Sequence, residues 1–302
     1  MSHFTVLVVG EPLEELLQPY HEFECTGKLD RYVQDVPKDV GKLRAEYEDK
    51  REEYEYKTFE EFLEDYHGLH PCKYGEELDF EGEHKYGWFK MDESGNVIAA
   101  ADRTNPNAKW DWWQLGGRWT GFFKLKQGRE GQKGTPGLMT PAATLPEAAD
   151  QCRWGDIDIE GMREEARQEA GKDFDTYFAI LKEYPETKNW KQVREEYPNI
   201  DDARKAYHEQ PAVKAWWKAH MFADSPMDTY GTDREAYIEK QAANALSTFA
   251  ILKDGKWYER GEMGWWATVS NEKDEKEWSD TVDKILGEIS DDTLVSVVDC
   301  HI

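Results

Sequence analysis

The stretch KWDWWQLGGRW, residues 109–119, constrains the fold of this chain more than any other segment. It holds four tryptophans together with two adjacent glycines and one arginine, namely Trp110, Trp112, Trp113, Gly116, Gly117, Arg118 and Trp119. Each tryptophan buries a large apolar area and carries an N–H group that needs a partner, so a dense cluster indicates a packed core or a recognition surface. Adjacent glycines inside an aromatic run indicate a turn, a bulge or a close approach of the backbone.

The aromatic content predicts what the core is made of. Only 39% of the 302 residues are hydrophobic, yet the chain has 13 Trp, 15 Tyr and 12 Phe. The core should therefore consist of few, large side chains rather than many aliphatic ones. A chain of this length can form one large domain or two small ones, and in both cases it can bury a real core.

The formal net charge of −25 argues against several functions. Binding to a phosphate backbone or to an anionic membrane surface needs an excess of lysine and arginine. An acidic surface is compatible with a basic protein partner, with mimicry of a nucleic acid, or simply with solubility.

The charge is unevenly distributed along the chain. Residues 1–100 carry 11 Lys and Arg against 25 Asp and Glu, and residues 151–302 carry 20 against 33. Residues 101–150 carry 7 against 5, so the tryptophan-rich segment is the only one of the three that is not acidic.

Signals for export, membrane insertion and cofactor binding are missing from the sequence. No run of 18 apolar residues occurs, and the opening MSHFTVLVVG lacks a basic start and a small-residue cleavage site. Cys25, Cys72, Cys152 and Cys300 are widely spaced, which is typical of free thiols in a reducing compartment. Neither GxGxxG nor GxxxxGK occurs. We therefore predict a cytoplasmic protein without a cofactor.

Apolar periodicity predicts strands at both ends and in the centre of the chain. Residues 3–9 and 293–302 are apolar runs, residues 86–102 and 247–270 alternate around turns, and residues 271–289 form an amphipathic helix. The predicted fold class is α+β. An antiparallel or mixed sheet core is built from both chain ends and the tryptophan-rich region, with a large helical insertion, and a ferredoxin-like core is one such arrangement.

The predicted organisation has five parts. They are an α/β core from residues 1–10 and 246–302, an acidic helical arm over 11–85, a tryptophan-rich β region over 86–126, a mobile loop over 127–146 and a helical lobe over 147–245. Within the arm, residues 39–66 are expected to form one charged helix with a thin apolar stripe.

Three clusters have the chemistry of metal ligands, but each also has a structural interpretation. They are His21 with Cys25, the turn HGLHPC at residues 67–72, and Asp156 with Asp158 and Glu160. Pro19 and Gly27 leave little room for a helix that would place His21 and Cys25 on one face. The spacing in HGLHPC fits no standard zinc finger and is typical of a turn. An N-cap role explains the cluster of Asp156, Asp158 and Glu160. No metal site is predicted.

The candidate binding residues are the aromatic and basic side chains of the tryptophan-rich stretch and the loop after it. They are Trp110, Trp112, Trp113, Arg118, Trp119, Arg129 and Lys133.

Several segments resemble an uncharacterised family of proteins found in phages, prophages and bacteria. They are the opening MSHFTVLVVG, the segments HEFECTG and YVQD, the core DRTNPNAKWDWWQLGGRWTGFFKLK and the ending SVVDCHI. The resemblance covers both ends and the centre of the chain and is weaker over the acidic helices. It implies a phage or mobile-element context, in which small acidic accessory proteins often block host defence machinery, and it implies no catalytic residues.

We therefore expect a phage or mobile-element accessory protein that acts by protein–protein binding in the host-cell cytoplasm. Its partner would be a host protein or complex with a basic, nucleic-acid-binding surface, for instance a Gabija-type anti-phage defence complex, inhibited through acidic surfaces. Neither direct nucleic-acid binding nor membrane binding is expected. The sequence is compatible with both a monomer and a homo-oligomer.

The alternative is an enzyme or a small-ligand-binding protein with a pocket at the tryptophan-rich stretch. Its chemistry would come from Arg118 with Asp111, Asp156 and Asp158, or from Cys300 with His301. Adjacent strand residues point to opposite faces, which disfavours a direct Cys300–His301 pair. Because strands flank the stretch on both sides, we expect it to organise the fold, with function mainly on the acidic helices.

Overall fold

The computed structural model describes residues 2–22, 31–137, 147–219 and 230–302. Its strands are β1 (His3–Val9), β2 (Gln34–Lys38), β3 (His70–Cys72), β4 (Gly87–Met91), β5 (Val97–Thr104), β6 (Trp112–Gly117), β7 (Phe123–Lys124), β8 (Thr135–Pro136), β9 (Ala148–Ala149), β10 (Gln151–Arg153), β11 (Ala250–Lys253), β12 (Lys256–Glu259), β13 (Glu262–Met263), β14 (Val269–Ser270) and β15 (Leu294–His301). Its α-helices are α1 (Leu13–Leu17), α2 (Val40–Lys50), α3 (Phe59–Asp65), α4 (Ile159–Glu183), α5 (Trp190–Glu196), α6 (Ile200–Glu209), α7 (Pro211–Ala219), α9 (Arg234–Ala243) and α10 (Glu275–Gly287). This content confirms the predicted α+β class.

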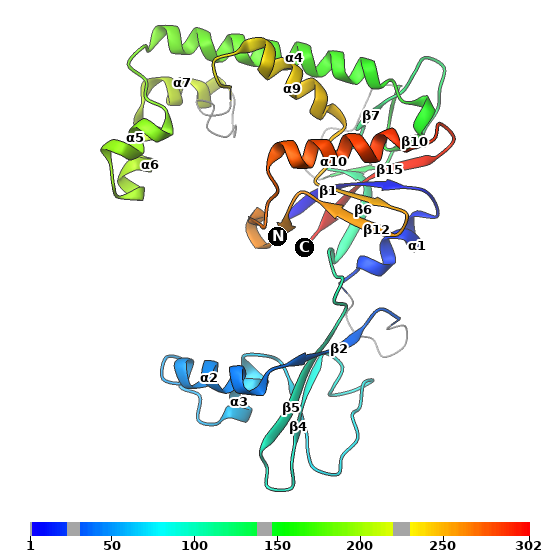
Figure 1. Cartoon of the computed structure of the whole chain (residues 1–302), viewed down its shortest axis with the longest axis vertical. Helices are drawn as coiled ribbons and strands as arrows, with labels where there is room; N and C mark the ends of the chain where they lie inside the picture. Colours follow the sequence, from blue (N-terminus) through cyan, green and yellow to red (C-terminus); the bar gives the residue numbers. More distant parts are fainter. Residues whose placement is uncertain (1, 23–30, 138–146, 220–229) are drawn as a thin grey trace.

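The main sheet is built from both ends of the chain and the tryptophan-rich stretch (Figure 1). Its strand order is β12-β11-β1-β15-β6-β8, and β10 also pairs with β15. Strand β1 is parallel to β11 and antiparallel to β15, and β15 is antiparallel to β6. The first and last strands are central because both are apolar runs that can be buried on both faces.

Two apolar clusters cover the two faces of this sheet. On one face, α10 packs over the strands with Trp278, Val282 and Ile285, as its predicted amphipathic pattern requires. On the other face, Phe4, Val6, Val8, Leu17, Trp110, Ala250, Leu252, Val298 and Cys300 form the second cluster. The tryptophan-rich stretch therefore contributes to the core of the sheet.

The strand directions differ from a ferredoxin-like core in one respect. A ferredoxin-like sheet alternates strand direction from neighbour to neighbour, whereas β1 and β11 lie side by side and run parallel, with Val6 opposite Ala250. The long connection between these two strands, which includes the second sheet and the helical lobe, makes a parallel pairing possible because no tight turn joins them. The core is mixed, as the broader prediction allowed.

A second sheet, with strand order β2-β5-β4-β3, packs against α2 and α3 and lies below the main sheet in Figure 1. The segment 86–126, predicted as one β region, is thus divided. Its hairpin β4–β5 belongs to the second sheet, while β6 joins the main one. The hairpin itself was predicted correctly.

The charged segment 39–66 forms two helices instead of the single helix that we expected. Helix α2 ends at Lys50, and Glu55 in the following turn has a φ of +58°, which a helix cannot accommodate. Thr58 then caps α3 by accepting a hydrogen bond from the Glu61 N–H at 3.1 Å. This hydrogen bond satisfies one of the backbone N–H groups that the start of a new helix leaves without a helical partner.

The helical lobe is organised around α4, which runs beside α9 (Figure 1). Asp158 caps α4, because its carboxylate accepts a hydrogen bond from the Gly161 N–H at 3.0 Å. This confirms the expected N-cap. Asp233 caps α9 in the same way, through the Ala236 N–H at 3.1 Å.

The segment MGWWATV, predicted as a strand, is interrupted in the structure. Only the two-residue strands β13 and β14 form, and a 3-10 turn lies between them. Trp266 and Ala267 have φ values of +60° and +56°, which exclude a continuous strand.

Residues 138–146 of the predicted loop 127–146 lie outside the described part of the chain, and residues 127–137 include β8. Of the described helices, none is long and apolar enough to span a bilayer.

Candidate functional site

The face of the main sheet that α10 covers becomes polar at one end. Along β1 toward the N-terminus, Leu7 is followed on the same face by Thr5 and His3. The register pairs Thr5 with Asp299 and His3 with His301, so these two β15 residues lie on the same face. Polar side chains at such positions add no hydrophobic burial, which makes this end of the sheet a candidate functional site.

Each histidine at this end is held by a carboxylate. Nδ1 of His3 lies 2.8 Å from Oδ1 of Asp299, and Nδ1 of His301 lies 2.7 Å from Oδ1 of Asp111. The two imidazole rings are neighbours, with centroids 5.0 Å apart and planes at 73°. A carboxylate on Nδ1 favours the tautomer that is protonated there, and it leaves Nε2 to exchange a proton with a ligand. We call these four residues the histidine–aspartate site.

Asp299 is the buried anchor of the site. Its side chain is 0% exposed, whereas that of His3 is 18% exposed and that of Asp111 is 42% exposed. The second carboxylate oxygen of Asp299 accepts a hydrogen bond from the backbone N–H of Arg118 at 3.0 Å. With one donor on each oxygen, the carboxylate is held in one orientation, and it orients His3 in turn.

The adjacent glycines of the tryptophan-rich stretch make room for two buried carboxylates. Gly116 and Gly117 have φ values of +73° and +56°. A Cβ on Gly117 would lie 2.3 Å from Cβ of Asp299, and a Cβ on Gly116 would lie 2.6 Å from Oδ2 of Asp150. The close backbone approach that the sequence indicated is therefore an approach to these aspartates.

Asp150 organises the turn that follows the glycines. It is fully buried and accepts hydrogen bonds from the backbone N–H groups of Gly121, Phe122 and Gly134 and from the hydroxyl of Thr120. A buried carboxylate needs such a set of donors to offset the loss of water. Asp150 thus links residues 120–122 to residue 134.

The structure separates the predicted binding residues. Trp110 is buried in the core, and Trp113 and Trp119 pack against the two apolar clusters of the sheet. Arg129 is exposed and pairs with Asp156 at 3.3 Å, and Lys133 is exposed on the same segment. Only Trp112 and Arg118 are exposed next to residues of the histidine–aspartate site.

Trp112 forms an aromatic wall beside both histidines. Trp112 is 46% exposed, and its ring centroid lies 6.3 Å from that of His3 and 6.5 Å from that of His301. Both ring pairs are T-shaped, with planes at 81° and 78°.

A cavity of about 320 Å³ lies on the same face of the sheet. Its lining residues are Thr5, Asn244, Ser247, Thr248, Phe249, Arg260, Glu275 and Trp278. Thr5 is two residues from His3 on β1 and points to the same side. None of the four residues of the histidine–aspartate site is among its lining residues.

The structure gives other contacts to the described residues of the clusters with metal-ligand chemistry. Cys25 lies outside the described residues, and the Cys72 thiol donates to the Glu76 carbonyl at 3.5 Å. Asp156 pairs with Arg129, and Asp158 caps α4. Over residues 2–22, 31–137, 147–219 and 230–302, no group of three or more His, Cys, Asp or Glu side chains is placed to hold a metal ion.

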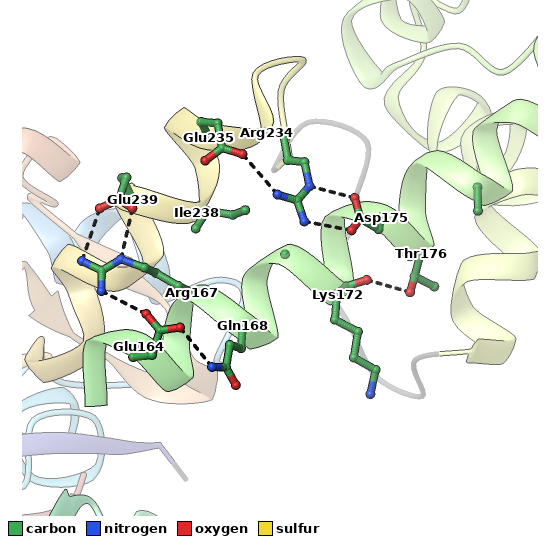
Figure 2. A pocket seen from close by; sticks show the side chains of 12 residues that line it. Glu164, Arg167, Gln168, Lys172, Asp175, Thr176, Arg234, Glu235, Ile238 and Glu239 are labelled. Carbon is green, nitrogen blue, oxygen red and sulfur yellow. Dashed lines mark hydrogen bonds and ion pairs between the residues drawn. The ribbon is translucent and has the colours of Figure 1, made fainter. Parts of the chain in front are cut away.

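A shallow groove of about 910 Å³ follows the contact between α4 and α9 (Figure 2). Its charged side chains bind one another. Arg167 contacts Glu239 at 3.1 Å, and Arg234 contacts Asp175 through both carboxylate oxygens at 2.8 and 2.9 Å. Hydrogen bonds with Glu160 and Glu239 raise the pKa of the Arg167 guanidinium, and those with Asp175 raise the pKa of the Arg234 guanidinium. The groove is a helix–helix contact held by ion pairs rather than a vacant site.

The buried thiols are not suited to nucleophilic chemistry. Cys300 and His301 lie on opposite faces of β15, as expected, because Cys300 belongs to the cluster on the far side of the sheet. Burial raises the pKa of the Cys300 thiol well above its usual value, and burial raises that of Cys152 to about 12. A thiol that stays protonated at neutral pH is a poor nucleophile.

We predict that these thiols resist alkylation in the folded protein. In a Cys25→Ser variant, iodoacetamide should label Cys72, Cys152 and Cys300 only after denaturant is added, since all three are buried. Raising the pH from about 7 to about 9 should add little reaction at Cys152, whose pKa is about 12. Intact-mass spectrometry measures the labelling. Rapid native labelling of Cys152 would contradict the packing around β10.

Comparison with models of protein families, with curated proteins and with solved structures found no match for this chain. The resemblance inferred from the motifs therefore stays a prediction, and the site must be interpreted from its own geometry.

The sequence contained a signal for this site that residue-by-residue inspection missed. Asp299 and His301 are two apart in a predicted strand, so they share a face, and so do His3 and Thr5. Two strands that each carry polar residues at alternate positions near one end are unusual in an otherwise apolar pair. The pairing register was needed to bring His3 and His301 together.

Proposed function

We propose that the protein binds a small molecule at the histidine–aspartate site and catalyses a proton-coupled reaction there. The observation that carries this proposal is the pair of adjacent imidazoles, 5.0 Å apart, each tied at Nδ1 to its own carboxylate. Core packing does not require this arrangement, because these polar side chains occupy positions at the end of two buried strands where apolar side chains would pack.

Two neighbouring imidazoles can supply both proton transfers of one reaction. A neutral imidazole removes a proton from the attacking group, while a protonated imidazole gives a proton to the leaving group. Asp299 and Asp111 are positioning residues, because each fixes the ring and tautomer of its histidine. Trp112 supplies an apolar wall for the substrate.

A comparison of metabolite consumption tests this function. The wild-type protein and the double variant His3→Asn, His301→Asn are incubated with a small-molecule extract of bacterial cells, and mass spectrometry follows every compound. We expect at least one compound to be consumed about 100-fold or more faster by the wild-type protein. His70→Asn is the control, because His70 is an exposed histidine in the second sheet.

Equal consumption by the wild-type protein and the double variant would overturn the catalytic proposal, provided that both are folded. Circular dichroism and unfolding in urea establish the folded state. Asparagine keeps hydrogen-bonding capacity at both positions, so we expect the double variant to fold.

A second proposal follows from the acidic surface of the helical lobe. Residues 147–245 carry 14 Lys and Arg against 22 Asp and Glu, and Glu164 and Glu235 lie exposed along the α4–α9 groove. Such a surface supports binding to a basic, nucleic-acid-binding host protein, and a Gabija-type defence complex is the partner that we propose.

Calorimetry with a purified Gabija-type complex tests the second proposal. We expect binding that weakens steeply with salt, competes with DNA and falls at least tenfold in the Glu164→Lys, Glu235→Lys variant. Lysine substitutions at Glu60 and Glu61 of α3 are the matched control, because they change the net charge equally on a different element. Binding that is insensitive to salt would contradict an electrostatic interface.

A further inference from the structure

We propose that the substrate of the histidine–aspartate site is a small cyclic nucleotide, whose phosphodiester bond the two histidines hydrolyse. This inference rests on the proposed function and narrows it to one substrate class. Three observations select the class: the ring beside the histidines, the distribution of charge, and the presence of two proton-transfer groups.

The exposed ring of Trp112 fits a nucleobase. It is 46% exposed and forms T-shaped contacts with His3 and His301 at 6.3 and 6.5 Å between centroids, so a base stacked on its exposed surface would lie near both imidazoles. Stacking of a base on an aromatic side chain contributes about 1–3 kcal/mol and tolerates any base. A phosphodiester attached to that base then falls within reach of the imidazoles.

The charge favours a small anion over a polymer. The formal net charge is −25, which opposes binding of RNA or DNA, whose affinity depends on many lysine and arginine contacts. The segment 101–150, which supplies Asp111, Trp112 and Arg118, carries 7 Lys and Arg against 5 Asp and Glu. A ligand with one or two phosphates needs far fewer cationic contacts than a nucleic-acid polymer does.

The two histidines are sufficient for the hydrolysis step. One neutral imidazole takes a proton from water as the water oxygen forms a bond to phosphorus. The other, protonated imidazole donates a proton to the leaving ester oxygen as its bond to phosphorus breaks. One phosphodiester and one water become one phosphomonoester and one hydroxyl group, and no electron is transferred.

The charged groups that face the imidazoles are known from the contacts of the site. Asp299 and Asp111 lie at the two Nδ1 atoms, each imidazole faces the other, and Arg118 follows β6 with its backbone N–H on Asp299. A carboxylate therefore occupies the Nδ1 side of each imidazole, which leaves Nε2 as the atom for proton transfer.

The test uses 2′,3′-cyclic AMP, 3′,5′-cyclic AMP and cyclic di-AMP as probes, in excess EDTA, with products followed by phosphorus NMR and chromatography. We expect the wild-type protein to convert at least one probe to a phosphomonoester. The variants His3→Asn and His301→Asn should each lose about 100-fold or more, and His70→Asn should keep the wild-type rate. Asp111→Asn should lower kcat at least about tenfold and leave KM unchanged, as expected of a positioning residue.

Failure of this inference can be distinguished from failure of the proposed function. If the folded wild-type protein hydrolyses none of the three probes, the substrate class is wrong. A histidine-dependent loss of some other compound in the metabolite comparison would then still support the catalytic site. Faster cleavage of single-stranded RNA than of the cyclic probes would overturn the argument from charge.

Discussion

Replacing Gly117 by alanine is expected to destabilise the protein by about 3 kcal/mol or more. The added Cβ would lie 2.3 Å from Cβ of Asp299 and 2.4 Å from its Oδ2, so either β6 or β15 must shift. The residue would also keep a φ of +56°, which costs a side chain about 1–2 kcal/mol. Unfolding in urea, followed by circular dichroism, measures the loss.

Gly128→Ala is the matched control for this prediction. Gly128 has a similar φ of +76°, but no atom lies within 4 Å of the position that a Cβ would occupy. Its substitution should cost about 1–2 kcal/mol through backbone strain alone. Equal losses at the two positions would show that the contact between Gly117 and Asp299 contributes nothing to stability.

Replacing Asp150 by alanine is expected to lower the free energy of unfolding by about 3 kcal/mol or more. The substitution leaves four donors without their acceptor, three backbone N–H groups and the hydroxyl of Thr120. Hydrogen exchange at residues 120–122 and 134 should accelerate more than exchange in α4.

Asp280→Ala is the control for the aspartate substitution. Asp280 is exposed on α10 and pairs with Lys276 one turn away, so its loss should leave stability almost unchanged. If Asp150→Ala were as mild as this control, water rather than the carboxylate would satisfy the four donors in solution.

The same glycines and aspartates connect stability to the candidate site. Gly117 allows the backbone to approach Asp299, and the next residue, Arg118, donates its N–H to that carboxylate. Asp299 in turn orients His3. A substitution at Gly117 that the fold tolerates should therefore still lower activity at the histidine–aspartate site, because the positioning of His3 depends on it.

Local patterns were sufficient to predict several elements of the fold. The apolar runs at residues 3–9 and 293–302 became β1 and β15, and the amphipathic pattern at 271–289 became α10. The N-cap role expected within the cluster of Asp156, Asp158 and Glu160 was also correct, since Asp158 caps α4. These predictions succeeded because each depends on side chains close together in sequence, where periodicity and capping chemistry dominate.

Predictions failed where backbone conformation or distant pairing was decisive. The helix expected over 39–66 breaks at the left-handed Glu55, and the strand expected at 263–269 breaks at Trp266. The β region expected over 86–126 is shared between two sheets, because the partners of β4 and β6 lie elsewhere in the chain. No local pattern distinguishes the sheet that a strand will join.

The sequence by itself predicted the class of the fold, a core built from both chain ends, and a turn, bulge or close backbone approach at Gly116 and Gly117. Only the tertiary structure decided which tryptophans are core and which face solvent, and that His3, Asp111, Asp299 and His301 form one site. The physical reason is the register of β1, β15 and β6. Each strand places alternate residues on one face, but only cross-strand pairing sets which residues of different strands lie opposite each other.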